Sequence, residues 1–489
     1  MRILFFDIGE IDYKGVEILA AILKKHGHVV DLLLDPGLGK HYYFKLPLLN
    51  LLFRDTLLLR KLKSFNPDLI AMSIVTNNFL YFRNFGMKIK ENFDVPIIVG
   101  GIHPTSVPEF VIKEDWVDFL CIGEGEEAIV ELADKLHYNQ DFSQIKNLWI
   151  KDKNGKIYKN PLRPLISNID TFPFPDRSLY EKYGVLGKRI RFATGRGCIH
   201  SCSFCVNSFR KTLYCGQKYL RKRSVENTIS ELVEIKRIYN PRAIRFEDDV
   251  FVLDRDWLFR FKEEYKEKIN LPFHCYFTPT GVKEDIIEIL KEAGCQSIAM
   301  GIQSGNEELR YTIMKRQYSN EQVVKAAQII KNKGIKLYAE YMFGLPGETP
   351  EKMWETLRLS EKISSNNTWT SLFYPYPGTE LATYCKENGY ITSEIWNKVL
   401  EGQGGPQNGT ILNFKYESEA SNFKVLLPIY NAVPKFLKPF VKFFLKRKYG
   451  FFQRALYLIS IPILEKREFI YRIIRLPVII IKTRRILKG

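Results

Sequence analysis

Three cysteines within eight residues constrain this chain more than any other feature. Cys198, Cys202 and Cys205 have the spacing C-x3-C-x2-C and directly follow a strand-like apolar run at 190–194. Thiolates are the soft ligands that iron–sulfur clusters require. Three of them on one loop can each bind one iron of a 4Fe-4S cluster and leave the fourth iron open to a small molecule. The chain must therefore fold so that this loop emerges at the end of a strand.

The residues around the cysteines favour a cluster over zinc. Gly195 and Gly197 precede them and allow the backbone to turn sharply beside a bound group. A structural zinc site usually combines paired C-x2-C elements with a fourth ligand. Here the fourth ligand would have to be His200 or the distant Cys215. Zinc stays open as the alternative, and a 4Fe-4S cluster is the prediction.

The cysteine spacing, with Phe204 just before the last cysteine, resembles the cluster loop of the radical S-adenosylmethionine (SAM) enzymes. The resemblance implies that Cys198, Cys202 and Cys205 hold the cluster and that the amino and carboxylate groups of SAM chelate the open iron. It also implies that the reduced cluster cleaves SAM to a 5′-deoxyadenosyl radical. An external electron donor of the flavodoxin or ferredoxin type is expected with it.

Residues 1–140 predict a separate α/β domain with a doubly wound parallel sheet. Short apolar runs alternate with amphipathic helices there, and such sheets bind ligands at the carboxyl ends of their strands. The expected strands are 2–7, 28–34, 69–73, 96–99 and 119–122, and two of the expected helices are 15–26 and 126–137. A plain Rossmann dinucleotide site is less favoured because no G-x-G-x-x-G follows the first strand.

The runs PDLIAMSI, VPIIVGGIHPT and FLCIGEGE resemble the cobalamin-binding domain that precedes many radical SAM domains. The D-x-H-x-x-G motif that supplies a histidine to cobalt in other cobalamin proteins is absent after Asp7. The resemblance therefore implies cobalamin with a buried base tail and no histidine on cobalt. The residues expected at this cofactor are Ser73, Thr76, Gly100, Gly101, His103, Gly123 and Glu124. A histidine that only supports a turn is the alternative for His103, and a fold without its cofactor is the alternative for the domain.

Residues 141–188 are irregular and proline-rich, and we interpret them as a linker with a hairpin about Asn154-Gly155. Residues 189–390 again alternate strand and helix. The expected strands are 190–194, 243–247, 272–277, 297–301, 337–343 and 371–376. Six such units are fewer than the eight of a closed barrel, and they fit the partial barrel that the radical SAM resemblance implies.

Polar residues follow the strands of this second unit. Glu247 and Asp248 come after its second strand, and adjacent carboxylates suit the ammonium end of SAM because they are costly together without a partner. A solvated acidic loop is the alternative. Gln303 and Ser304 resemble the family's ribose-contacting stretch, and Gly344 permits close approach to an adenine.

The last region, 391–489, is predicted to be helical and basic. From residue 422 onward it holds sixteen Lys and Arg against two Glu, which accounts for most of the net charge of +18. Its apolar runs are shorter than the ~20 residues of a spanning helix. Lysines at 435, 438, 442 and 446 beside phenylalanines at 436, 440, 443 and 444 are typical of a helix lying in a membrane interface. A basic helical cap on the barrel is equally open, and nucleic acid is less favoured. We expect a chain that ends near residue 409 to stay soluble and keep its cluster.

Together these patterns predict an α/β enzyme of the cobalamin-dependent radical SAM kind, which includes methyltransferases and the anaerobic magnesium-protoporphyrin ester cyclase. The predicted reaction is methylation of an unactivated carbon of a small molecule, and a lipophilic substrate is compatible with the tail. Eight unevenly spaced cysteines and no signal-peptide pattern predict a cytoplasmic protein, with a peripheral position at the inner membrane face as an option. Oxidative cyclisation without methyl transfer, loss of cobalamin, and a non-catalytic cluster protein stay open.

Overall fold

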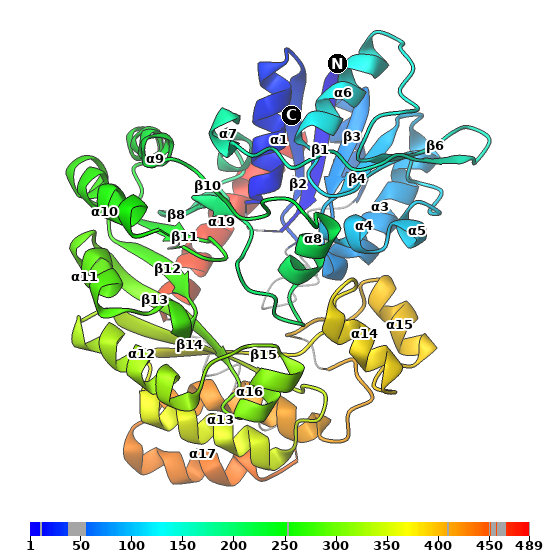
Figure 1. Cartoon of the computed structure of the whole chain (residues 1–489). Coiled ribbons are helices and arrows are strands. Elements are labelled where there is room, and N and C mark those ends of the chain that lie inside the picture. Colours follow the sequence, from blue (N-terminus) through cyan, green and yellow to red (C-terminus); the bar gives the residue numbers. More distant parts are fainter. Residues whose placement is uncertain are drawn as a thin grey trace.

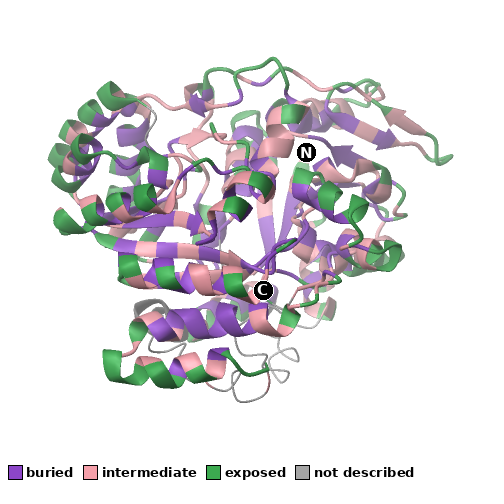
Figure 2. Ribbon diagram, turned by 60° about the horizontal axis from the view of Figure 1, so that its bottom comes forward, coloured by how far each residue is buried: buried purple, intermediate pink, exposed green. Residues whose placement is uncertain are grey.

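Two sheets, each flanked by helices, form the framework of the computed structural model (Figure 1). The structure describes residues 1–9, 12–37, 55–251, 254–407, 410–448, 450, 456 and 466–488. The buried residues are concentrated in the strands of both sheets and in the helix faces that cover them (Figure 2).

The first sheet has the strand order β2-β1-β3-β4-β5-β6-β7. Its five parallel strands confirm the predicted ones to within two residues at each end. They are β1 (Arg2–Ile8), β2 (Val29–Asp35), β3 (Leu69–Ser73), β4 (Ile97–Gly100) and β5 (Phe119–Cys121). The predicted hairpin is also present, as β6 (Leu148–Lys151) and β7 (Ile157–Lys159). Because β6 pairs with β5, part of the segment predicted as a linker extends the first sheet.

Helices cover both faces of the first sheet, which explains why its strands read as nearly continuous apolar runs. Along β1, Ile3 and Phe5 enter the core on one face, and Leu4 and Phe6 enter the core on the other. The helices are α1 (Lys14–Lys25), α2 (Asp55–Phe65), α3 (Phe79–Asn92), α4 (Ile102–Ser106), α5 (Pro108–Val111) and α6 (Glu126–His137).

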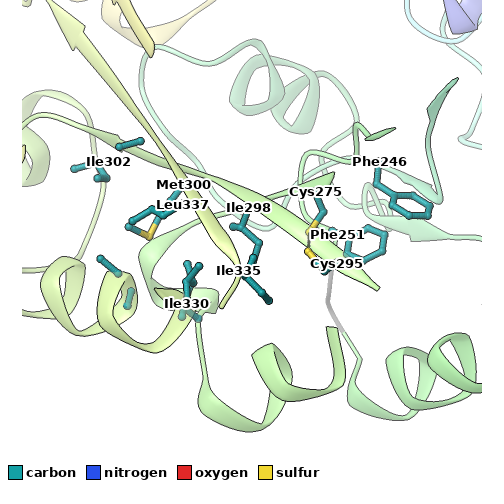
Figure 3. Packing of buried hydrophobic residues seen from close by; sticks show 14 of the residues in the cluster. Phe246, Phe251, Cys275, Cys295, Ile298, Met300, Ile302, Ile330, Ile335 and Leu337 are labelled. Atoms are coloured by element: carbon teal, nitrogen blue, oxygen red, sulfur yellow. Dashed lines mark hydrogen bonds between the residues drawn. The ribbon is translucent and has the colours of Figure 1, made fainter. Parts of the chain in front are cut away.

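The second sheet is a partial barrel of six parallel strands in the order β15-β14-β13-β12-β11-β8. The strands are β8 (Arg189–Phe192), β11 (Ala243–Phe246), β12 (Phe273–Phe277), β13 (Cys295–Gln303), β14 (Lys336–Phe343) and β15 (Asn367–Leu372). The helices between them are α9 (Val225–Tyr239), α10 (Arg255–Glu264), α11 (Glu284–Glu292), α12 (Asn320–Asn332) and α13 (Pro350–Ile363). Alternate residues such as Ile298, Met300 and Leu337 pack outward against these helices (Figure 3). The residues that alternate with these along each strand face the interior of the barrel.

The sixth strand of the barrel differs from the predicted one. β15 spans Asn367–Leu372 and pairs with β14 over Phe343↔Leu372 at its end, whereas 371–376 was predicted. Pro375 and Pro377 supply no backbone N–H to a ladder, so pairing stops before them. The residues from Phe373 onward form an irregular segment that leads into α14 (Glu380–Glu387).

The C-terminal region is not a single appendage. α16 (Glu417–Ala432) and α17 (Lys438–Leu445) lie beside the second sheet, and α16 packs against β15 and α13. α15 (Ser393–Leu400) lies near helix α3 of the first sheet, where Glu401 at its end pairs with Arg83 at 3.8 Å. The last helix, α19 (Lys466–Lys488), instead packs against α2 of the first sheet. In Figure 1 the C-terminus accordingly lies beside the first sheet, near α1. One of the apolar runs of this region, at 455–464, falls outside the described residues, apart from Leu456. No helix in the described ranges is long and apolar enough to cross a bilayer.

The prediction that a chain ending near residue 409 would stay soluble and keep its cluster conflicts with the packing of α16. α16 buries Phe423, Leu426 and Leu427, whose exposed fractions are at most 1%, within the same core as the barrel strands. Removing them would expose the outer face of β15. The run of apolar residues in α16 was therefore a core signal, although the charge surplus around it suggested a detachable tail.

Candidate functional site

The cysteine loop leaves β8 at the carboxyl end of the barrel, as predicted. Just before the first cysteine the chain forms a short strand, β9 (Gly195–Arg196), that pairs with β10 (Arg221–Lys222). Gly197 has a φ of +93°, and a Cβ atom there would lie 2.6 Å from the carbonyl oxygen of Tyr219. Only glycine fits this position, so the backbone is pressed against β10 immediately before Cys198.

The three cysteines are free thiols on one loop. Cys202 is buried, whereas Cys198 and Cys205 are partly buried. The backbone N–H of Cys205 donates to the carbonyl oxygen of Cys202 at 3.1 Å, and Cys205 is the residue from which α8 (Val206–Leu213) begins. The pKa of the Cys198 thiol is raised to about 11, chiefly by burial and in smaller part by the charges of Asp249, Cys205 and Cys202.

This donor set fits an iron–sulfur cluster. One buried and two partly buried thiols whose negative charges would repel one another need nearby positive charge to ionise, and the irons of a cluster supply it. The two residues that a zinc site would need are engaged or remote: His200 Nε2 lies 3.3 Å from Thr278 Oγ1, and Cys215 is exposed beyond α8. Within the described part of the chain, no three metal-ligating side chains converge closely enough to hold a single metal ion.

The carboxylates after β11 separate into three environments. Glu247 pairs with Arg191 at 2.6 Å and with Arg245 at 3.2 Å. Asp248 is buried and accepts hydrogen bonds from the backbone N–H and the hydroxyl of Thr194, at 3.0 and 2.5 Å. The two residues predicted to hold the SAM ammonium group are thus already held by the protein's own donors.

The third carboxylate of this run, Asp249, faces the cysteine loop. Its charge raises the pKa of both Cys198 and Cys205, and its side chain forms a hydrogen bond with Asn207 of α8. Burial raises the pKa of Asp249 itself. Asp249 belongs to the acidic run that the sequence shows after this strand, but the predicted contacts were its neighbours Glu247 and Asp248.

The other predicted SAM contacts lie at the same end of the barrel. Gln303 has a φ of +71° directly after a register shift between β13 and β14, which is a rare conformation for a residue other than glycine. Ser304 is fully buried, and its hydroxyl accepts from the N–H of Asn306 at 3.2 Å, so it supports the turn. The N–H of Gly344 donates to Glu348 at 2.6 Å. Phe204 is partly buried against the apolar cluster that contains Phe373 and Leu381.

A cavity of about 350 Å³ lies at the carboxyl ends of the first sheet, a size within the usual range of small-molecule and cofactor sites. Five of the predicted cobalamin contacts line it: Ser73, Gly100, Gly101, Gly123 and Glu124. Residues from both sides of the cysteine loop complete the lining, namely Gly195 and Arg196 before it and Arg210 after it. The cavity and the cysteine loop therefore share a wall.

The glycine loop after β4 depends on close backbone contact. Gly101 has a φ of +96°, and a Cβ atom there would lie 2.8 Å from both the backbone nitrogen and the carbonyl oxygen of Ile74. Any side chain would push this loop away from β3, on whose end Ser73 lies. The predicted glycine turn is thus a structural requirement of the cavity wall.

Two other predicted contacts, Thr76 and His103, do not line the cavity. His103 is fully buried, its Nδ1 atom lies 3.3 Å from Thr76 Oγ1, and its ring packs on Phe79 with 4.6 Å between centroids. Burial lowers the pKa of His103 to about 3, so its ring is neutral. This geometry is that of a histidine supporting a turn, the alternative considered for it.

Glu124 makes contacts that the sequence did not reveal. Its carboxylate receives two hydrogen bonds from Arg221 of β10, at 2.5 and 3.0 Å, and pairs with Arg196 of β9 at 3.3 Å. Burial alone would raise the pKa of Glu124, but the arginines outweigh it and lower the pKa, so this carboxylate is ionised. The backbone N–H of Glu124 also donates to Tyr214 Oη at 3.0 Å. These contacts, here called the Glu124 clamp, join the first sheet to the strands that precede the cysteine loop.

Comparison with known proteins identifies the two domains on which these residues lie. Residues 192–360 match the model of the Radical SAM superfamily, and residues 9–133 match that of the B12 binding domain. The uncharacterized methyltransferase PH0819 of Pyrococcus horikoshii is 30% identical over 347 residues, which cover 69% of this chain and 73% of that protein. Cytidylyl-2-hydroxyethylphosphonate methyltransferase of Streptomyces wedmorensis is 23% identical over 431 residues, covering 78% of this chain and 79% of that enzyme.

Solved structures share the same fold. The radical SAM methyltransferase TsrM of Kitasatospora setae, with cobalamin and a [4Fe-4S] cluster bound, aligns with a TM-score of 0.63 at 18% identity, over 80% of this chain and 76% of that one. The fold and the cysteine loop thus define a radical SAM enzyme. The chain belongs to the members of this superfamily that carry a B12-binding domain, and its cofactors are a 4Fe-4S cluster, SAM and cobalamin.

The cavity lining leads to a spectroscopic prediction. No histidine is among the described residues that line the cavity, and His103 is buried outside it. We expect cobalamin to bind with its own base displaced and without a protein histidine on cobalt. The cobalt(II) form should therefore give an electron paramagnetic resonance spectrum without nitrogen superhyperfine splitting. Such splitting, if it disappeared in a His103→Ala variant, would assign His103 as a ligand instead.

Proposed function

We propose that this enzyme transfers a methyl group to an unactivated carbon of a small-molecule substrate. The observation that carries the proposal is the shared wall: residues on either side of the cysteine loop line the cavity of the B12-binding domain. A radical source and a methyl carrier must act on one carbon in sequence, so their sites have to be adjacent. Relatives that match most of this chain are named methyltransferases, which supports the same reaction.

The cofactors supply the reactive groups, and the residues of this chain determine where the cluster and cobalamin lie relative to each other. When bound, the cluster supplies the electron that cleaves SAM and cobalamin carries the methyl group. Ser203 anchors the cysteine loop, because its backbone N–H donates to the carbonyl oxygen of Met314 at 3.2 Å. The Glu124 clamp fixes the first sheet against the start of that loop. Position is therefore set by contacts that exist before any substrate arrives.

We assign the remaining contacts on the geometry above. For SAM, the proposed contacts are Phe204, Asp249, Gln303 and Gly344, with Asp249 in place of Glu247 and Asp248. For cobalamin they are Ser73, Gly100, Gly101 and Gly123, whereas Glu124 acts through its clamp. The enzyme would work in the cytoplasm with an external donor of the flavodoxin or ferredoxin type, since a reducing compartment preserves thiolates.

Oxidative cyclisation is the second candidate. The anaerobic magnesium-protoporphyrin IX monomethyl ester cyclase of Cereibacter sphaeroides is 25% identical over 389 residues, covering 73% of this chain and 61% of that enzyme. This reaction would use the same cluster and the same cavity without moving a methyl group. Only the fate of the methyl group separates the two candidates.

The test follows that methyl group. The reconstituted holoenzyme would be given reductant, SAM with a deuterated methyl group, and a metabolite extract as the source of substrate. Methyl transfer predicts S-adenosylhomocysteine and 5′-deoxyadenosine in comparable amounts. It also predicts a product that carries the three deuterons of the methyl group and is heavier by them than the product formed with unlabelled SAM. If the extract stimulates formation of 5′-deoxyadenosine but neither S-adenosylhomocysteine nor a labelled product appears, methylation is wrong and the cyclisation candidate replaces it.

A further inference from the structure

The short segment from Lys435 to Leu445 exposes a cluster of large apolar side chains. The exposed fractions are 78% for Phe436, 40% for Leu437, 53% for Phe440 and 50% for Phe443. We call these four residues the aromatic face. They lie on the single turn η7 (Lys435–Leu437) and on α17, which Figure 1 places outermost, beyond α13 and α16.

The opposite side of α17 is firmly packed. Val441 and Leu445 are 6% and 2% exposed and belong to the core of the second sheet. The interpretation of this helix as a cap on the barrel therefore holds for its inner side. The aromatic face stays exposed, because among the described residues the rings of Phe440 and Phe443 contact Phe444 and Arg447 of the same segment and the four side chains lie outside that core.

Basic side chains surround the aromatic face. Lys435, Lys446 and Arg447 are exposed, and the Arg447 guanidinium lies 4.6 Å from the centroid of the Phe443 ring. Lys438 and Lys442 lie toward the body of the protein, with their ammonium groups 4.7 and 5.4 Å from the Tyr430 ring. Positive charge thus borders the apolar side chains on the solvent side.

Among the described residues, exposed apolar side chains are clustered beside basic ones in the segment 435–447. Elsewhere in the described ranges, large exposed apolar residues occur singly or in pairs, as with Phe259 on α10 at 52%. Scattered residues of that kind are normal on soluble proteins, whereas a gathered patch marks an interaction surface. An apolar protein partner would not by itself require a rim of cations. A surface with a negative outer layer and an apolar layer beneath it requires both.

We propose that the aromatic face binds the surface of an anionic lipid bilayer. The phenylalanine rings would enter the boundary between headgroups and acyl chains, and the exposed Lys435, Lys446 and Arg447 would lie among the lipid phosphates. The helix would lie in the plane of the surface, since its inner side stays packed on the protein. This inference goes beyond the proposed reaction, because it concerns where the enzyme works and not what it transfers.

The test is sedimentation of the full-length holoenzyme with vesicles. Vesicles of phosphatidylcholine mixed with phosphatidylglycerol should bind it at low salt, vesicles of phosphatidylcholine alone should bind it weakly, and high salt should release it. The double variant Phe440→Ser/Phe443→Ser should bind the mixed vesicles at least about tenfold more weakly than the unaltered protein. Phe259→Ser is the matched control, because it removes an equally exposed phenylalanine from another helix, and it should bind like the unaltered protein.

Iron content and SAM cleavage of the double variant should match those of the unaltered protein, which shows that it is folded. The inference is overturned if the unaltered protein ignores anionic vesicles at low salt, or if the double variant binds them equally well. It is also overturned if the aromatic face instead joins two copies of the chain, seen as a dimer that the double variant abolishes. None of these measurements depends on the methyl-transfer reaction.

Discussion

Replacing Cys198 with alanine should leave a protein with almost no cluster iron and no cleavage of SAM. If each of the three loop thiolates binds one iron, as we expect, Cys202 and Cys205 alone cannot hold three of the four. The other sulfur atoms are not placed to substitute. Cys275 and Cys295 lie 3.8 Å apart in the outer core of the barrel, and Cys215 is exposed. The measurements are iron and sulfide content after anaerobic reconstitution and the yield of 5′-deoxyadenosine.

Cys215→Ala is the matched control, since it removes a cysteine from the same segment without touching the loop. It should keep full iron content and full SAM cleavage. Equal losses in Cys215→Ala and Cys198→Ala would falsify the three-cysteine assignment. A Cys198→Ala protein that keeps its iron would show that another group supplies the third ligand.

Replacing Ser73 with tryptophan should strongly weaken cobalamin binding and leave the cluster intact. Ser73 ends β3 and lines a cavity of about 350 Å³, into which an indole ring at this position would add bulk where the cofactor is expected to bind. Overpacking a fitted site costs about 1–3 kcal/mol, which corresponds to about 5- to 150-fold in affinity. Cobalamin content from the absorption spectrum and iron content from the same sample give the two readouts. SAM cleavage at the cluster should continue.

Ser73→Ala is the control for this variant, because it removes the hydroxyl group without adding volume, and it should bind cobalamin nearly normally. An unchanged thermal unfolding midpoint would show that the tryptophan variant is folded. If the tryptophan variant binds cobalamin as tightly as the unaltered protein, the cavity is not where the cofactor's buried part lies. Loss of iron along with cobalamin would instead mean that the shared wall had collapsed.

The regular elements were largely predictable, for a physical reason. A strand buried on both faces needs an almost unbroken apolar run, and a covering helix needs one apolar stripe, so each writes its own pattern into the sequence. The helix predicted at 126–137, for example, is found there as α6 (Glu126–His137). The sixth barrel strand was misplaced by four residues because Phe373 and Tyr374 continue the apolar pattern past the point where the prolines stop the pairing.

The cysteine loop was predictable because its ligands are close in sequence. The Glu124 clamp was not, because its arginines are 72 and 97 residues away and become neighbours only when the two sheets meet. The same limit applies to α19, whose return to the first sheet depends on contacts such as that of Arg475 with the carbonyl oxygen of Gly184 at 2.8 Å. The surplus of basic residues in α19 could be counted from the sequence, but it did not indicate which part of the protein this helix packs against.

The Glu124 clamp limits how freely such enzymes can be recombined. A chimera that takes its B12-binding domain from a relative would bring a new side chain to position 124, while Arg196 and Arg221 would stay behind in the barrel. Arg221 is 2% exposed, so without its carboxylate it would be a buried, unpaired cation, a situation that typically costs about 3–5 kcal/mol. Exchange of the two modules should therefore succeed only when the acidic residue and its two arginines are inherited together.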